Sequence, residues 1–115
     1  MPYVSVTTNV SVNAPTAEAL LADLTEAVVV NLNKPKDYVQ VGVNGNQPLQ
    51  FAGTAGPTAF VELRALGLTE ELAQQMSPVL TDVIHGSLSI PAERIFLNLL
   101  DVPRSRWGWN GSTFG

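Results

Sequence analysis

The chain has 115 residues, of which 45% are hydrophobic and only 14% are charged, and its formal net charge is −4. It has no cysteine and one histidine, His85, which excludes disulfides, cysteine zinc sites and a cysteine nucleophile. The acidic balance argues against a nucleic-acid partner, and so high an apolar content in a short chain predicts oligomerisation, because small domains bury less of their surface.

The first half of the chain begins with a strand and a helix. Tyr3–Thr8 is dominated by β-branched residues, which favour a strand. Apolar residues then recur with a helical period over Thr16–Leu32. Pro15 suits the start of a helix, Glu18 suits its positive N-terminal end, and Pro35 follows its end.

The pattern then repeats. A strand is predicted over Tyr38–Val43 and another over Ala59–Leu66. Thr69 can cap a second helix, whose apolar stripe runs to Leu88. The last long strand is predicted over Ile95–Leu100.

An internal duplication organises these elements. Asn31–Val43 aligns with Ser87–Leu99 at a constant offset of 56 residues, which places Pro35 opposite Pro91. We therefore expect one domain over residues 1–115, with repeats at about 2–45 and 58–101 and a tail at 102–115.

Two β-α-β units predict an α+β, two-layer fold with one four-stranded sheet and both helices on one face. The runs Val39–Val43 and Ile95–Leu100 are nearly all apolar, and such strands are usually covered on both faces. The second face then needs another subunit to cover it.

The N-terminus indicates the compartment. Met1–Val12 has neither a basic segment nor a long apolar core, so it does not resemble a signal peptide, and no apolar run is long enough to span a membrane. We expect a cytoplasmic protein that does not bind membranes, with secretion by a route independent of a signal peptide left open.

Three segments carry a family resemblance. The start Met1–Val4, the tripeptide Asn33–Pro35 and the ending Gly108–Phe114, within the duplicated plan, resemble the macrophage migration inhibitory factor family of the tautomerase superfamily. The resemblance covers essentially the whole chain. It implies a homotrimer with a barrel-like core and keto–enol tautomerisation of phenylpyruvate-type acids, at pockets between subunits, without a cofactor or metal.

Pro2 is the candidate catalytic residue. Removal of Met1 leaves a secondary amine at the chain terminus. An α-amino group has a pKa of about 7.7–8.0, and burial or a nearby cation lowers it. The amine would then be a neutral base near pH 7, where general bases contribute roughly 10²–10⁴-fold.

The resemblance implies the rest of the site. Lys34 would hold the substrate carboxylate, the Leu66 N–H would bind the polar end of the substrate, and Asn98 would reach in from a neighbouring subunit. The candidates for an apolar wall around an aromatic ring are Tyr38, Phe96, Trp109 and Phe114.

Three departures from the family pattern narrow this expectation. Phe96 stands where the family often has Tyr, so a hydroxyl donor is lost. The segment Thr58–Val61 replaces a Cys-x-x-Cys motif, which excludes thiol oxidoreductase activity. Val10–Val12 lacks the charges with which the cytokine members bind receptors.

Two other functions stay open. The chain could be a non-enzymatic signalling or binding protein on the same trimeric scaffold. It could also hydrate or dehalogenate an unsaturated acid, a reaction that needs additional arginines, for which Arg64 and Arg106 are the candidates. His85 is interpreted as a surface or capping residue.

Overall fold

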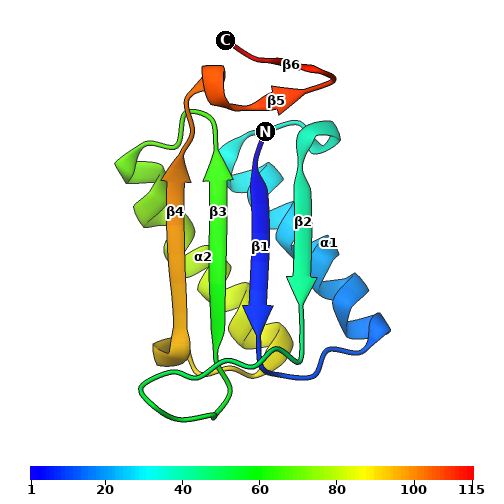
Figure 1. Cartoon of the computed structure of the whole chain (residues 1–115), viewed down its shortest axis with the longest axis vertical. Helices are drawn as coiled ribbons and strands as arrows, with labels where there is room; N and C mark the ends of the chain where they lie inside the picture. Colours follow the sequence, from blue (N-terminus) through cyan, green and yellow to red (C-terminus); the bar gives the residue numbers. More distant parts are fainter.

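The alternation of the strands and the period of the helices sort the apolar side chains onto one side of a single sheet. The computed structural model describes all residues, Met1–Gly115. In Figure 1 two helices cover one face of a four-stranded sheet, which confirms the predicted α+β architecture. The elements are β1 (Tyr3–Thr8), α1 (Ala14–Leu32), β2 (Gln40–Asn44), β3 (Ala59–Ala65), α2 (Glu70–Leu88), β4 (Ile95–Asp101), and a short hairpin of β5 (Gly108–Trp109) and β6 (Ser112–Thr113).

The sheet order is β2-β1-β3-β4. Each β-α-β unit supplies a parallel pair, β1 with β2 and β3 with β4. The two units join through the antiparallel pairing of β1 and β3, in which Val6 lies opposite Val61. The amino end of β1 therefore lies at the same end of the sheet as the carboxyl ends of β3 and β4.

The core lies between the sheet and the helices. Its largest fully buried apolar side chains come from alternate positions of β1 and β3, from one stripe of each helix and from the segment before β4: Val4, Val6, Val61, Leu63, Leu20, Leu24, Val28, Met76, Leu80, Ile84 and Ile90. The predicted helical stripes are thus confirmed. Neither helix combines the length and apolarity that crossing a membrane requires.

The start of α1 differs from the prediction. The side chain of Asn13 accepts a hydrogen bond from the Thr16 N–H at 2.9 Å, so the helix begins at Ala14, two residues early. Glu18 consequently lies beyond the first turn, which contains no acidic residue, and its predicted role there is wrong. The helix ends as expected at Asn33, whose φ of 52° is left-handed.

The predicted start of the second strand is also wrong. Lys36–Tyr38 forms a short 3₁₀ helix, in which the Tyr38 N–H donates to the Pro35 carbonyl at 3.2 Å. Pairing with β1 begins only at Gln40. Tyr38 therefore lies on the turn before β2, at the end of the sheet where β1 starts.

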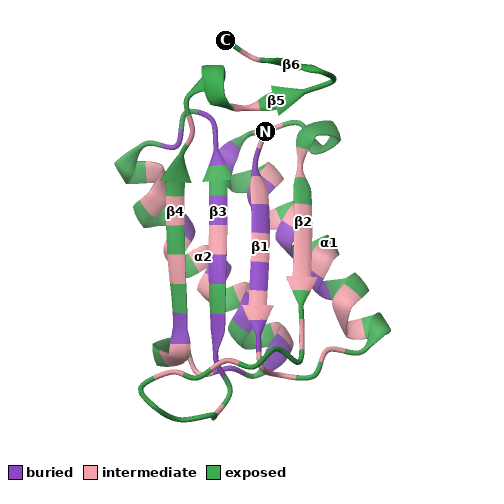
Figure 2. Ribbon diagram, viewed as in Figure 1, coloured by how far each residue is buried: buried purple, intermediate pink, exposed green.

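The second face of the sheet has no cover within the chain, as predicted, but it is not the apolar surface that the strand composition suggested. Figure 2 shows buried residues alternating with half-buried and exposed ones along β1 and β3. The alternate positions that face away from the helices carry both polar and apolar side chains. They are Tyr3, Ser5, Thr7, Gln40, Asn44, Phe60, Glu62, Arg64, Phe96, Asn98 and Leu100. Much of the apolar content lies instead in the helix-facing core.

The segment between β2 and β3 is held by two polar side chains. Asn9 Nδ2 donates to the carbonyls of Leu49, Ala55 and Gly56. Arg94 donates to the carbonyls of Pro57, Thr54 and Gly56 at 2.8, 3.2 and 3.1 Å. These bonds give a long loop a defined path at the far end of the sheet from Pro2 (Figure 1).

Candidate active site

Pro2 is buried and lies immediately before β1. In Figure 1 the N-terminus lies beneath the C-terminal hairpin, at one end of the sheet. A cavity of about 360 Å³ lies there. It brings together four of the predicted residues, Pro2, Tyr38, Trp109 and Phe114.

The tail forms the aromatic wall of this cavity. Asn110 and Gly111 have φ values of 50° and 84°, which suit a two-residue turn and close the hairpin. Trp109 then stands edge-on to Tyr38, with ring centroids 5.6 Å apart, and stacks with Phe114 at 6.1 Å. Trp109 and Phe114 were predicted as parts of an apolar wall, and both line this cavity.

The terminal amine has an environment that favours its neutral form. In the chain with Met1 present, burial lowers the pKa of the Met1 α-amino group below its ordinary value, and the positive charge of Lys34 lowers it further. Pro2, the next residue, is buried at the same place. An amine at this end of β1 is therefore easier to deprotonate than an ordinary chain terminus.

Lys34 is half-buried just after α1, and its Nζ donates to the Leu66 carbonyl oxygen at 3.3 Å. Both residues line a small cavity of about 50 Å³. No hydrogen bond within the chain engages the Leu66 N–H. The structure thus joins Lys34 and Leu66 to each other and brings the Lys34 charge within reach of the terminal amine.

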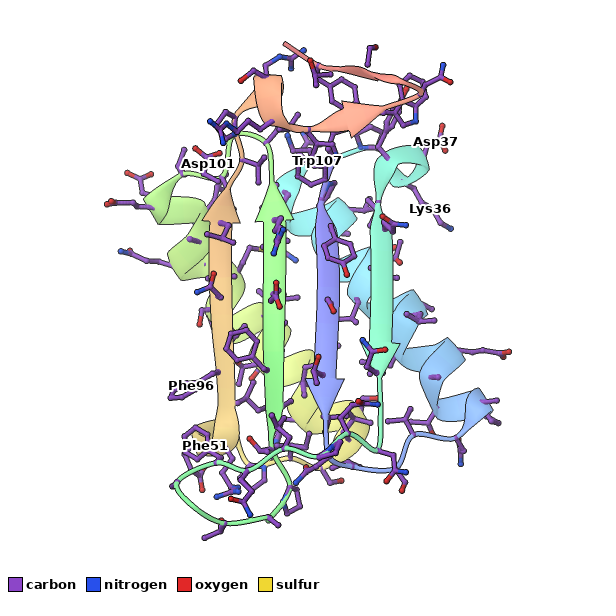
Figure 3. The ribbon with its side chains drawn as sticks, in the orientation of Figure 1. Lys36, Asp37, Phe51, Phe96, Asp101 and Trp107 are labelled. Carbon is purple, nitrogen blue, oxygen red and sulfur yellow. The ribbon has the colours of Figure 1, made fainter.

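Phe96 and Asn98 are not brought to Pro2. Both project from β4 on the open face, and Phe96 is 59% exposed. Phe96 packs instead on Phe51 of the long loop, with ring centroids 4.8 Å apart. Figure 3 shows this pair at the end of the sheet opposite Trp107. Within one chain, the predicted site is therefore in two parts.

The cavity around Pro2 also has walls that the sequence reasoning missed, among them Asp37, Gln40 and Trp107. Asp37 and Gln40 lie within two residues of Tyr38 in the sequence, and Trp107 lies two residues before Trp109. Closeness in the sequence to the predicted residues was therefore the signal that could have found them. His85 is exposed, as expected of a surface residue, and its Nδ1 lies 2.8 Å from the Ile90 carbonyl oxygen, two residues after the end of α2.

Comparison with known proteins decides the family. Residues 1–115 match the family described as macrophage migration inhibitory factor (MIF). The chain belongs to the macrophage migration inhibitory factor family. Among its relatives, the homolog from Brugia malayi is 32% identical over all of both chains. The macrophage migration inhibitory factor of Rattus norvegicus is 33% identical over 99% of both chains.

Solved structures of the macrophage migration inhibitory factor family agree with this fold. The homologue from Prochlorococcus marinus superposes with a TM-score of 0.93 at 36% identity, covering 98% of this chain and 99% of that one. The protein from Trichinella spiralis gives a TM-score of 0.89 at 30% identity, covering 97% and 99%. The chain therefore has the family's architecture along nearly its whole length.

Proposed function

We propose that the protein is a cytoplasmic keto–enol tautomerase of phenylpyruvate-type 2-keto acids and that the amine of Pro2, freed by removal of Met1, is its general base. The observation that carries the proposal is the position of the chain terminus. It lies beside Pro2, in a cavity with aromatic walls, where burial and Lys34 lower the amine pKa. A neutral amine near pH 7 is what proton abstraction next to a ketone needs.

The reaction moves one proton between two atoms of the substrate. The neutral Pro2 nitrogen takes a proton from the carbon next to the ketone, and the C–H electron pair becomes the C=C bond of the enol. The C=O π electron pair becomes the O–H bond when the protonated Pro2 amine returns its proton to the carbonyl oxygen, which leaves the amine neutral again. The rigid pyrrolidine ring fixes the nitrogen at the strand end. This helps to position the nitrogen for proton transfer from the substrate.

Lys34 supplies a point charge for the substrate carboxylate. The Leu66 N–H has no partner within the chain, so it is free to donate to the polar end of the substrate. The aromatic ring of the substrate would lie against Tyr38, Trp109 and Phe114, which already pack on one another.

The second part of the site would come from a neighbouring subunit of a homotrimer. Asn98 and Phe96 lie on the open face, and both side chains are exposed. In this assembly Asn98 binds the distal polar group of the substrate, and Phe96 adds an apolar surface without a hydroxyl donor.

The test is the rate of phenylpyruvate enol–ketone conversion in wild type, Pro2→Gly and Lys36→Ala. Lys36 is exposed in the 3₁₀ helix beside the site and serves as the control for a nearby change. We expect Pro2→Gly to lose on the order of 10²-fold or more in kcat/KM and Lys36→Ala to keep wild-type activity. Wild-type rates in Pro2→Gly would show that the Pro2 amine is not the base. No turnover in wild type, with partner binding retained in Pro2→Gly, would instead support a binding protein on this scaffold.

A further inference from the structure

The turn between β3 and α2 carries the unpaired N–H of Leu66. This turn runs from Ala65, the last residue of β3, to Thr69, whose side chain caps α2. Leu66 is buried, yet its N–H has no partner within the chain. Gly67 follows with a φ of 70°, a left-handed conformation that glycine adopts without strain. The direction of the Leu66 N–H therefore depends on the contacts that hold this turn.

Two consecutive residues at the end of β4 hold the turn on both sides of Leu66. The Val102 N–H donates to the Ala65 carbonyl at 2.9 Å. The Leu68 N–H donates to Asp101 Oδ1 at 3.1 Å, in a partly buried bond. A carboxylate is a stronger acceptor than a neutral oxygen. One bond precedes Leu66 and the other follows it, so its peptide group is fixed between two points.

The Asp101 side chain lies on the helix side of the sheet. Asp101 is the register partner of Ala65, which belongs to the core beneath the helices. Figure 3 shows Asp101 at the end of β4, at the same end of the sheet as Trp107. This carboxylate is therefore not part of the open face that neighbouring subunits would cover.

A third contact connects the turn to Lys34. The Lys34 Nζ donates to the Leu66 carbonyl at 3.3 Å, so the two groups that the proposed function assigns to the polar end of the substrate lie on one peptide segment. Displacement of this segment would change the position of the Leu66 N–H. A donor displaced by about 1 Å can lose most of its effect on a bound substrate.

We infer that Asp101 is a positioning residue, whose carboxylate holds the turn between β3 and α2 so that the Leu66 N–H is directed at the substrate. Asp101 touches no substrate atom in this role and acts through the Leu68 N–H. The inference rests on the proposed function, in which the Leu66 N–H binds the polar end of the substrate.

The test is the steady-state kinetics of phenylpyruvate conversion in Asp101→Ala and Asp101→Asn. We expect Asp101→Ala to raise KM about tenfold, since a hydrogen bond to the substrate is worth roughly that factor. The kcat value should stay within about twofold, because the base is unchanged. Asp101→Asn keeps an oxygen that can accept from the Leu68 N–H, so it should recover most of the loss.

Asn13→Ala is the matched control for a purely structural role. The Asn13 side chain also accepts one bond from a backbone N–H, that of Thr16 at 2.9 Å, at the start of α1. Both alanine variants should lower the thermal midpoint, but only Asp101→Ala should raise KM. An equal KM in the two variants would overturn the positioning role.

A binding measurement separates this inference from the proposed function. The probe is 3-phenylpropionate, which has the ring and the carboxylate of phenylpyruvate but no ketone. In ¹⁵N-labelled wild type we expect the Leu66 amide resonance to shift on titration, and in Asp101→Ala we expect a Kd about tenfold higher. An equal Kd and an equal Leu66 response in the two proteins would overturn the positioning role. Wild type that shows this response but does not convert phenylpyruvate would overturn the proposed function alone.

Discussion

Lys34 Nζ lies 3.3 Å from the Leu66 carbonyl oxygen. This bond joins the two repeats, because Lys34 follows α1 and Leu66 follows β3. It holds a flexible side chain at the end of the sheet where the chain begins, and its positive charge contributes to the lowered pKa of the terminal amine. In the proposed mechanism, Lys34 would therefore act on both the base and the substrate.

The pH profile of activity tests this double role. The neutral amine is the active form, so kcat/KM should rise with pH through an apparent pKa below the ordinary value for a chain terminus, about 7.7–8.0. Lys34→Ala removes the smaller of the two causes of the shift, so the rise should move to higher pH, although burial still keeps it below the ordinary value.

Lys34→Arg is the matched control, because it keeps the charge near the amine. The rise should stay at its wild-type pH in Lys34→Arg. An unchanged profile in Lys34→Ala would show that this charge does not reach the base.

The aromatic wall provides a second prediction. Trp109→Ala removes the ring that contacts both Tyr38 and Phe114, so KM for phenylpyruvate should rise about tenfold, as expected for the loss of a large apolar contact. The thermal midpoint should change little, since Trp109 is 53% exposed. Steady-state kinetics and a melting curve on the same sample check both statements. An unchanged KM would remove Trp109 from the substrate pocket.

The sequence predicted what depends on local periodicity. The stripe through Leu20, Leu24 and Val28 follows from a helical repeat, and Asn33 and Thr69 mark helix ends by their own backbone and side-chain chemistry. The start of α1 was missed because Asn13 competes as a cap ahead of Thr16. Such a competition is decided by one hydrogen bond, which a pattern of apolar residues does not record.

Contacts between residues that are far apart in the sequence were harder to predict. Nothing in the strand Ile95–Asp101 indicates that Phe96 meets Phe51 at the far end of the sheet from Pro2. Arg64 and Arg106 line one hollow only because the 3₁₀ turn after β4 returns a distant segment to β3. Residues that meet only through tertiary structure leave no spacing signal in the chain.

The loop between β2 and β3 offers a stability test. Arg94→Ala deletes three hydrogen bonds to the carbonyls of Pro57, Thr54 and Gly56, and its guanidinium lies 5.3 Å from the Phe51 ring centroid. The free energy of unfolding should fall by about 1–3 kcal/mol, as measured by urea denaturation. Arg94→Lys keeps the positive charge but lacks the branched set of guanidinium donors. It should recover less than half of the free energy of unfolding that Arg94→Ala loses. A loss below about 0.5 kcal/mol would show that the loop is held by other contacts.

Subunit assembly can be tested on the open face. Wild type should have a solution mass three times that of the 12.3 kDa chain. Phe96→Asp places a charge on that face and should yield smaller species with lost activity. Val30→Asp is the matched control, because Val30 is 64% exposed on α1, against 59% for Phe96 on β4. Equal masses for the two variants would remove Phe96 from the subunit interface.

The most direct test of the central claim is the activity of two N-terminal forms of one protein. Mass spectrometry identifies the chain that starts at Pro2 and the chain that retains Met1, and each form is assayed with phenylpyruvate. With Met1 present the Pro2 nitrogen is an amide and has no basic lone pair, so we predict turnover only in the form that starts at Pro2. Equal turnover in the two forms would contradict the assignment of the Pro2 amine as the base.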